Sequence, residues 1–262
     1  MDLGLAGRHV LITGGSKGIG LACARQFAAE GAHVTLVARG QAGLDAALAV
    51  LPAAQPAHRA YATDVRDADA VARLVDRVYA EAGPVDVLVN CAGAARRTPF
   101  DELTPQAWHD AMQAKFFAYV HVIDPVIKRM GQAGRGAVVN VIGAGGKMAS
   151  SIHLAGGSAN AALMLASAGL AAAYGPRGVR VNAVNPGLTL TERLAEGLAA
   201  DARQADASPA DVLAQHTARI PLRRLADPQE IANAVVFLAS DKASYITGAI
   251  VAMDGGVTPM VV

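Results

Sequence analysis

Residues Gly14 to Gly20, near the start of the chain, limit the possible folds more than any other segment. They read Gly-Gly-Ser-Lys-Gly-Ile-Gly, follow the apolar run Val10–Thr13 and precede an apolar segment of helical spacing. Glycines in this place permit a tight turn, a close approach of the backbone to a ligand and close helix–strand packing. The start of a helix also directs backbone N–H groups at an anion. Strand, glycine turn and helix in this order predict the first unit of a parallel α/β sheet with a pyrophosphate site; the alternative is a tight turn that holds no ligand.

Short apolar runs alternate with longer alanine-rich segments of helical period along the chain. Strands are expected at His9–Thr13, His33–Ala38, Arg59–Thr63, Val85–Asn90, Ala137–Ile142, Arg180–Val184 and Ala249–Met253. Helices are expected at Gly18–Glu30, Gln41–Val50, Ala68–Glu81, Pro105–Met130, Ile152–Tyr174 and Pro228–Ser240. This alternation predicts right-handed crossovers and a doubly wound, parallel seven-stranded α/β sheet with helices on both faces, a Rossmann fold.

No repeat or linker divides the chain, so residues 1–262 are expected to form a single domain. The segment Leu194–Gln215, within a region at about 188–217, is richer in Asp and Arg and is interrupted by Pro209. It is expected to be an exposed helical excursion that serves as a flexible substrate lid, with a plain surface insertion as the alternative.

Composition excludes several classes of protein. Hydrophobic residues make up 53% of the chain, which argues against disorder. The 23 Lys and Arg against 22 Asp and Glu give a net charge of +1, which argues against a nucleic-acid partner held through phosphates. Two cysteines, Cys23 and Cys91, form no disulfide framework and lack metal-ligand spacing, so no metal site is expected.

The uncharged segment Leu154–Gly175 is long enough to span a bilayer, but it consists mostly of Ala and Gly and contains Asn160. A buried or subunit-facing helix is the preferred interpretation. The first residues carry no basic region or long apolar run typical of a secretory signal. A cytoplasmic protein without a membrane partner is therefore expected.

The second expected strand indicates which dinucleotide the loop would take. An NAD-specific fold usually ends this strand with an acidic residue that binds the ribose hydroxyls. Here the strand ends Val37-Ala38-Arg39, and Lys17 in the glycine loop adds a second cation. Two cations without a carboxylate suit a ribose 2′-phosphate, so NADP(H) is preferred over NAD(H). Solvated surface charge is the alternative for each residue alone.

Several motifs, taken together, resemble the short-chain dehydrogenase/reductase family over essentially the whole chain. The matching segments are Thr13–Gly20 (TGxxxGIG), Asp64-Val65, Asn90-Cys91-Ala92-Gly93 (NNAG), Val181–Gly187, Ile246-Thr247-Gly248 and Asp254-Gly255-Gly256. The resemblance implies a cofactor site made by Gly14, Ser16, Lys17, Gly18, Ile19, Gly20, Arg39, Asp64, Val65, Asn90, Ala92, Gly93, Pro186, Gly187 and Thr191.

The family's redox site uses an Asn, a Ser, a Tyr and a Lys. The tyrosine transfers the proton to or from the substrate oxygen, and the lysine lowers the pKa of the tyrosine. Alignment from Asn160-Ala161-Ala162-Leu163, which is similar to the family's KAAL, places Asn160 at the lysine position and Gly156 at the tyrosine position. Gly143 then takes the serine position and Lys115 the asparagine position, so all four are replaced.

The family's Asn and Lys are exchanged, which makes Lys115 and Asn160 candidate catalytic residues. Lys115 would supply the ammonium that Asn160 lacks; a solvated helix charge is the alternative. None of the five tyrosines falls near position 156 in the sequence. His153, three residues before Gly156, is the candidate proton donor if the helix has already begun there, and a loop or cap histidine is the alternative. Arg96 and Arg97 either pair with an anionic substrate or are exposed loop charges.

The resemblance implies an NADP(H)-dependent oxidoreductase that acts on the carbonyl or alcohol of a small molecule, and a homotetramer or homodimer. The loss of the whole tetrad leaves open a nucleotide-binding regulatory or scaffold subunit. Non-redox lyase or isomerase chemistry on the same fold is a third interpretation. No residue pattern identifies the substrate.

Overall fold

The computed structural model describes residues 2–93, 97–205 and 207–259. Its core is a seven-stranded sheet in the order β3-β2-β1-β4-β5-β6-β7, in which every neighbouring pair is parallel. The strands are β1 (His9–Thr13), β2 (His33–Ala38), β3 (Arg59–Ala62), β4 (Val87–Asn90), β5 (Gly136–Val141), β6 (Val179–Pro186) and β7 (Ile250–Met253). The predicted doubly wound Rossmann sheet is confirmed.

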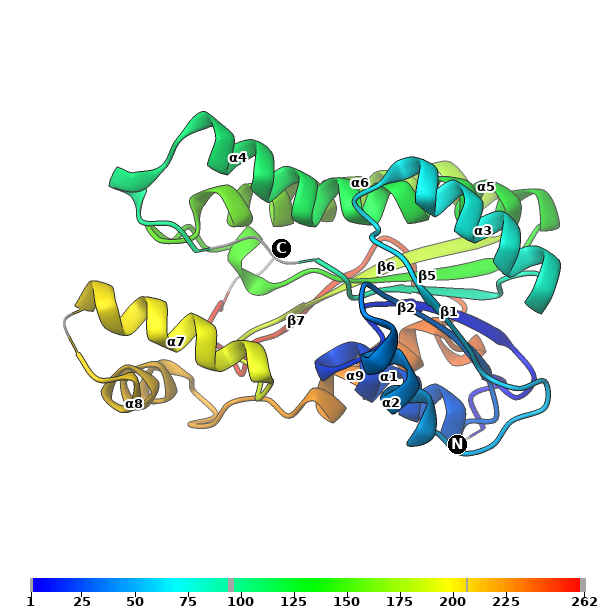
Figure 1. Ribbon diagram of the computed structural model, residues 1–262, viewed down its shortest axis with the longest axis horizontal. Coiled ribbons are helices and arrows are strands. Elements are labelled where there is room, and N and C mark those ends of the chain that lie inside the picture. Colours follow the sequence, from blue (N-terminus) through cyan, green and yellow to red (C-terminus); the bar gives the residue numbers. More distant parts are fainter. Residues whose placement is uncertain (1, 94–96, 206, 260–262) are drawn as a thin grey trace.

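Helices cover both faces of the sheet (Figure 1). One face carries α1 (Gly18–Ala29), α2 (Gln41–Ala49) and α9 (Pro228–Ala239), and the other carries α3 (Ala68–Ala82), α5 (Ala118–Ala133) and α6 (Leu154–Tyr174). The strand order reverses between β1 and β4. From β1 the chain adds β2 and β3 on one side of the sheet, and it then adds β4 to β7 on the other side. In such sheets the crevice beyond the strand ends at this reversal is the usual ligand site.

Strand β1 shows why the sheet is buried on both sides. Its side chains Val10, Leu11 and Ile12 are all fully buried. Because side chains alternate along a strand, Leu11 belongs to the core under α3 and α5, whereas Val10 and Ile12 belong to the core under α1 and α9. Each such burial stabilises the fold by roughly 1.5–3 kcal/mol, and the apolar β-branched strand is the sequence signal of a parallel sheet.

The helix predicted over Pro105–Met130 is present, but it contains a π-helical turn and ends three residues later. The structure has α4 (Pro105–Ala111), a π-helical turn (η2, Met112–Phe117) and then α5. The loop after β4 packs tightly against this turn, since a Cβ on Gly93 would lie 2.6 Å from the carbonyl oxygen of Ala114. A π turn adds one residue to one helical turn, which the apolar periodicity of a sequence does not register.

The other predicted boundaries agree with the structure within two residues. The predicted excursion between the sixth and last strands contains two helices, α7 (Glu192–Ala205) and α8 (Pro209–Arg219). These pack together through a small apolar cluster that includes Leu198 and Val212. In Figure 1 they lie at the same end of the molecule as α4.

Helix α6 and the short 3-10 turn that follows it, Leu154–Arg177, pass a length and hydropathy test for a membrane span, with a mean hydropathy of 1.3. The helix packs on β6, on the π turn and on the β5–α6 loop. Its side chains Leu163 and Ser167 are fully buried or nearly so. This is the pattern of a core helix, as the sequence analysis preferred.

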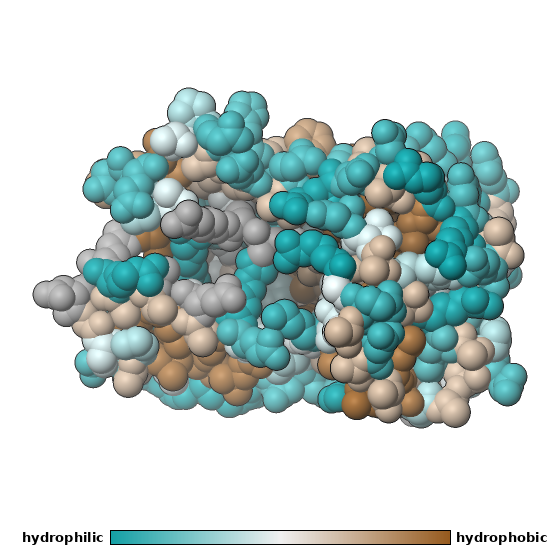
Figure 2. Space-filling view, in the orientation of Figure 1, coloured by the Kyte–Doolittle hydropathy of each residue, from teal (hydrophilic) through white to brown (hydrophobic). Residues whose placement is uncertain are grey.

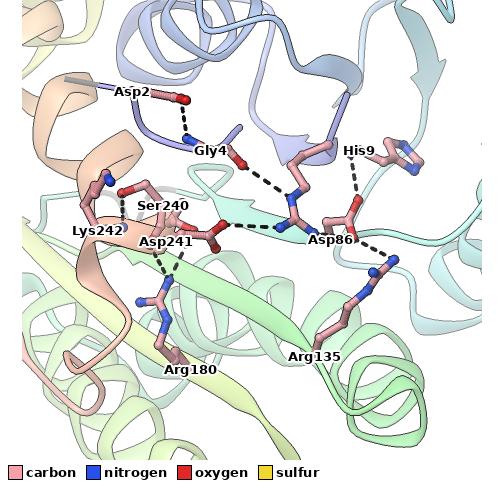
Figure 3. Close-up of polar contacts among 11 residues, drawn as sticks. Asp2, Gly4, His9, Asp86, Arg135, Arg180, Ser240, Asp241 and Lys242 are labelled. Carbon is pink, nitrogen blue, oxygen red and sulfur yellow. Dashed lines mark hydrogen bonds and ion pairs between the residues drawn. The ribbon is translucent and has the colours of Figure 1, made fainter. Parts of the chain in front are cut away.

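Hydrogen bonds and ion pairs join the loops at the N-terminal ends of the strands (Figure 3). Asp86 accepts a hydrogen bond from the backbone N–H of His9 and forms an ion pair with Arg135. Arg180 donates to the carbonyl of Ser240 just beyond α9. These groups fix the loops at the N-terminal ends of the strands and leave the C-terminal ends for the site.

Candidate active site

Three segments meet at the C-terminal edge of the sheet. Gly14, with φ +69°, lies so near the loop after β4 that a Cβ would be 2.8 Å from the backbone N of Ala92. A Cβ on Gly18, with φ +56°, would be 3.4 Å from Cγ2 of Thr191 in the segment after β6. Figure 2 shows this face hollowed between the layer that carries α4 and the layer that carries α7 and α8. The glycine loop, the end of β4 and the end of β6 therefore enclose one crevice.

The remaining glycines of the cradle serve close packing. A Cβ on Gly20 would lie 2.1 Å from the carbonyl oxygen of Gly14, so α1 could not start so near the turn with any other residue. Gly187 follows Pro186 at the end of β6, and its Cβ would be 2.9 Å from Cα of Asp254. Ile19 packs against the core, and Ser16 is half-buried in the loop. This geometry fits a pyrophosphate that approaches the backbone closely.

Buried side-chain amides join the strands beneath the crevice. Thr13 donates to Asn90 at 3.3 Å, and Asn90 donates to Asn140 at 3.0 Å. Asn140 in turn donates to Ser167 of α6 at 2.9 Å. The chain of hydrogen bonds runs through β1, β4 and β5, so Asn90 holds the strand ends in register, as the resemblance to NNAG implies. Asn140 and Ser167 were not singled out from the sequence.

The two cations proposed for the 2′-phosphate are both exposed. Lys17 Nζ pairs with Glu192 at the start of α7, 2.9 Å away. The charge of Arg39 makes the smallest contribution to the lowered pKa of the Asp64 carboxyl. The main cause of that lowered pKa is the hydrogen bond from Arg66, which holds Asp64 in an ion pair. Next to it, Val65 is buried.

Lys115 lies in the π turn, only 7% exposed. Its Nζ donates to the hydroxyl of Tyr119 at 3.0 Å and to the carbonyl oxygen of Val141 at 3.2 Å. Among the described residues no carboxylate pairs with it. Burial, followed by the positive charge of Arg193, lowers the pKa of Lys115 from 10.5 to about 7, against a small opposing effect of Cys91. A solvated helix charge, the alternative considered for Lys115, is excluded.

Tyr119 is the residue that the sequence analysis missed. It is fully buried, its hydroxyl donates to the carbonyl of Val141, and burial raises its pKa well above 10. The alignment places the family's tyrosine at position 156 in the sequence, whereas Tyr119 reaches the site from α5. The signal was the spacing from Lys115, since residues four apart lie on one helix face.

The positions aligned with the family's Ser, Tyr and Lys lie together on the β5–α6 loop and the first turns of α6. Gly143 has φ +132°, a conformation that side chains rarely adopt, and a Cβ there would be 3.4 Å from Nδ2 of Asn160. Asn160 and Gly156 are buried in α6. Lys115 and Asn160 sit on elements that pack together, the π turn and α6, but no hydrogen bond joins these two side chains.

His153 is the N-terminal cap residue of α6 and not part of the helix, so the condition for a helical spacing to Gly156 is not met and the alternative of a cap histidine is confirmed. The helix begins one residue later because His153 has φ −137° and ψ 28°. Its buried Nδ1 has no hydrogen-bond partner among the residues that the structure describes. Burial, and then the charges of Arg97, Arg193 and Lys115, lower the pKa of His153. The imidazole is therefore neutral near pH 7 and within electrostatic reach of Lys115.

Arg97 contacts the helical excursion between β6 and β7. Its Nη1 lies 2.6 and 2.5 Å from the two carboxylate oxygens of Asp201 on α7, and His216 of α8 lies 3.1 Å from the same carboxylate. Asp201 is 8% exposed. The expectation of an exposed loop charge is wrong for Arg97, because these contacts tie the loop after β4 to both excursion helices. Arg96 lies outside the described residues.

The described part of the chain contains no group of three or more His, Cys, Asp or Glu side chains that could hold a metal ion.

Comparisons with known proteins show the family and the fold of the chain. A family model described as enoyl-(acyl carrier protein) reductase matches residues 14–258. The chain is 39% identical over 257 residues to D-threitol dehydrogenase from Mycolicibacterium smegmatis, across 98% of this chain and 95% of that protein. L-sorbose reductase from Gluconobacter frateurii, solved with NADPH and L-sorbose, matches 100% of both chains with TM-score 0.90 and 31% identity. NAD+-bound xylitol dehydrogenase matches with TM-score 0.90 and 27% identity over 96% of this chain and 99% of that one.

Proposed function

The chain belongs to the short-chain dehydrogenase/reductase family, and we propose that it is an NADP(H)-dependent oxidoreductase of small polyols and ketoses. The observation that carries the proposal is the buried amine of Lys115 at the edge where the glycine loop, β4 and β6 converge. Support for the substrate class comes from the relatives, since threitol, sorbose and xylitol are all polyhydroxylated.

The residues named from the sequence would hold the cofactor. The loop Gly14–Gly20 would bind the pyrophosphate, with Asn90, Ala92 and Gly93 beside it and Pro186, Gly187 and Thr191 opposite. Asp64 and Val65 would flank the adenine. Arg39 and Lys17 would bind the 2′-phosphate, with Lys17 leaving Glu192. The similar solved structures include both an NADPH complex and an NAD+ complex, so the preference for NADP(H) rests on these two cations.

When bound, NADP(H) supplies or accepts the hydride at the substrate carbon. In reduction, Lys115 as an ammonium donates a proton to the developing alkoxide; in oxidation, Lys115 as an amine removes the proton from the alcohol. A pKa of about 7 keeps both forms populated near neutral pH. His153 would exchange the proton with solvent, and the Asn160 amide would orient the substrate oxygen.

We further propose that residues 1–262 act as one domain and that the segment at about 188–217 closes over the substrate. The chain forms a homotetramer or homodimer in the cytoplasm. The partners are the small-molecule substrate and further copies of the chain, without nucleic acid or a membrane.

The replacement of all four tetrad positions favours a second candidate, a nucleotide-binding protein without redox turnover or with lyase or isomerase chemistry. A fluorescence titration with NADPH and NADH, followed by turnover assays, separates the two. We expect tight NADPH binding well ahead of NADH, and steady-state NADPH oxidation that depends on a ketose. Binding without turnover on any carbonyl substrate would favour the second candidate, and no binding of either nucleotide would make the glycine loop a structural remnant.

A further inference from the structure

The contacts of Lys115 and Tyr119 fix how the amine is oriented. Lys115 Nζ donates to two neutral oxygens, the Tyr119 hydroxyl at 3.0 Å and the Val141 carbonyl at 3.2 Å. The Tyr119 hydroxyl donates its own proton to the same Val141 carbonyl. The hydroxyl proton is therefore committed, and the oxygen turns a lone pair towards Nζ.

This arrangement leaves two tetrahedral directions of the nitrogen unused. The Tyr119 and Val141 oxygens are joined by their own short hydrogen bond, so they lie close together and share one N–H direction of the ammonium; its other two N–H bonds point away from both. When the amine is neutral, its lone pair takes one of those two directions. The same position of the nitrogen can thus release a proton and take one up without a change of side-chain rotamer.

The surroundings of the pair make the lysine, and not the tyrosine, the group that titrates near neutral pH. The titratable groups that act on the pair from other elements are Cys91 after β4, Arg193 on α7 and His153 before α6. Burial lowers the pKa of Lys115 and raises that of Tyr119, because the neutral form of each is favoured away from water. Tyr119 therefore keeps its proton over the working pH range.

We propose that Tyr119 is a positioning residue that orients the Lys115 amine for proton transfer, so that the family's Tyr–Lys pair is rebuilt here with the two roles reversed. Here the tyrosine holds the amine in place, and the lysine transfers the proton. The catalytic consequence rests on the proposed redox function, whereas the coupling between the two side chains does not and can be measured without a substrate.

The test is an NMR titration of the whole protein, labelled with 13C and 15N at lysine. The chain has five lysines, Lys17, Lys115, Lys128, Lys147 and Lys242, so the Lys115 signal is assigned by its loss in Lys115→Met. We expect the Lys115 signal to titrate with a midpoint of about 7, well below the ordinary lysine value of 10.5. Tyr119→Phe removes an acceptor that stabilises the ammonium more than the amine, so the midpoint should fall by about one pH unit.

Tyr61→Phe is the matched control. Tyr61 is 7% exposed and its hydroxyl donates to Glu81 at 2.8 Å, far along the chain from Lys115. Loss of this buried hydroxyl should leave the Lys115 midpoint unchanged. If Tyr119→Phe does not fold, tyrosine labelled with 13C at Cζ in the wild type replaces it, because the Tyr119 signal must then shift at the pH where Lys115 titrates.

Each outcome decides the proposal. A Lys115 midpoint near 10, a midpoint unmoved by Tyr119→Phe, or a Tyr119 signal that ignores Lys115 would overturn the pair. A coupled pair in a protein without NADPH turnover would keep the pair and reject the proposed function. Where turnover is found, the pH profile of kcat should follow the Lys115 midpoint and move with it in Tyr119→Phe, an effect that general loss of packing would not produce.

Discussion

A lysine that is 7% exposed normally pairs with a carboxylate, yet the acceptors at Lys115 are a phenol and a backbone carbonyl. The lowered pKa of Lys115 affects the stability of the fold as well as the chemistry of the site. At 1.36 kcal/mol per pH unit, a shift from 10.5 to about 7 corresponds to a penalty on the order of 5 kcal/mol for the charged form. Residues held at such a disadvantage concentrate at functional sites.

Lys115→Met should therefore separate activity from stability. We expect turnover to fall by 100-fold or more, on the order of the contribution of one acid–base group, while the free energy of unfolding at pH 7 rises by about 1–3 kcal/mol. The folded-state pKa lies below the unfolded one, so the unfolded chain binds more protons between pH 7 and 10.5. The difference in unfolding free energy between Lys115→Met and the wild type, measured by urea unfolding, should therefore shrink as the pH rises through this window. Unchanged turnover would remove Lys115 from the mechanism.

A second residue-scale prediction concerns His9 and His33, whose rings stack 4.6 Å apart at the edge opposite the site. Both ring nitrogens of His33 are buried, and among the described residues neither makes a hydrogen bond of normal geometry. Burial is the largest cause that lowers the pKa of each histidine below 6.5. The unfolded chain therefore takes up protons first, and stability that is complete above pH 6.5 is lost as the pH falls through the folded-state values.

His33→Phe should keep the stack and lose part of this acid sensitivity, so its urea midpoint should fall less than that of the wild type between pH 6.5 and 5. The exposed His109, changed to Gln, is the control and should follow the wild type. Parallel curves for wild type and His33→Phe would contradict the assignment.

At the scale of elements, the sequence predicted the architecture better than the site. Strand, glycine turn and helix identify the crevice, because glycine patterns and buried apolar runs are local signals. The π turn that carries Lys115, the start of α6 after His153 and the Arg97–Asp201 contact depend on packing between distant segments. Tyr119 shows the same limit, since its hydroxyl meets Lys115 only once the helix and β5 are in place.

The contact between the glycine loop and α7 gives an element-scale prediction. Lys17 and Glu192 are exposed and 2.9 Å apart, so their ion pair is worth less than about 1 kcal/mol. Glu192→Gln releases Lys17 and removes a negative charge beside the phosphate site. NADPH binding, measured by fluorescence titration, should tighten by about 2- to 5-fold, and NADH binding should change less.

Asp124→Asn, which removes the exposed partner of Lys128 on α5, is the matched control and should change neither affinity. Equal tightening for NADPH and NADH in Glu192→Gln would argue against a 2′-phosphate at Lys17.

At the scale of the whole molecule, α5 and α6 form an apolar surface groove that includes Ile123, Ile127 and Leu170. Leu165 of α6 is 77% exposed. An apolar groove beside an exposed leucine on a long helix fits association with a second copy. Leu165→Glu should shift the mass measured by light scattering to a smaller species, whereas Val50→Glu at the end of α2 should not. A wild-type monomer would contradict the proposed oligomer.

The most direct measurement of the central claim follows deuterium from [4,4-2H2]NADPH, labelled at both C4 hydrogens so that either face can be used, into the product, with ketoses such as L-sorbose as substrates and mass spectrometry as the readout. The account predicts one deuterium on the reduced carbon with the wild-type enzyme and a rate at least 100-fold lower with Lys115→Met. Product that forms without deuterium would show non-redox chemistry, and labelled product at an equal rate from Lys115→Met would show that another group moves the proton.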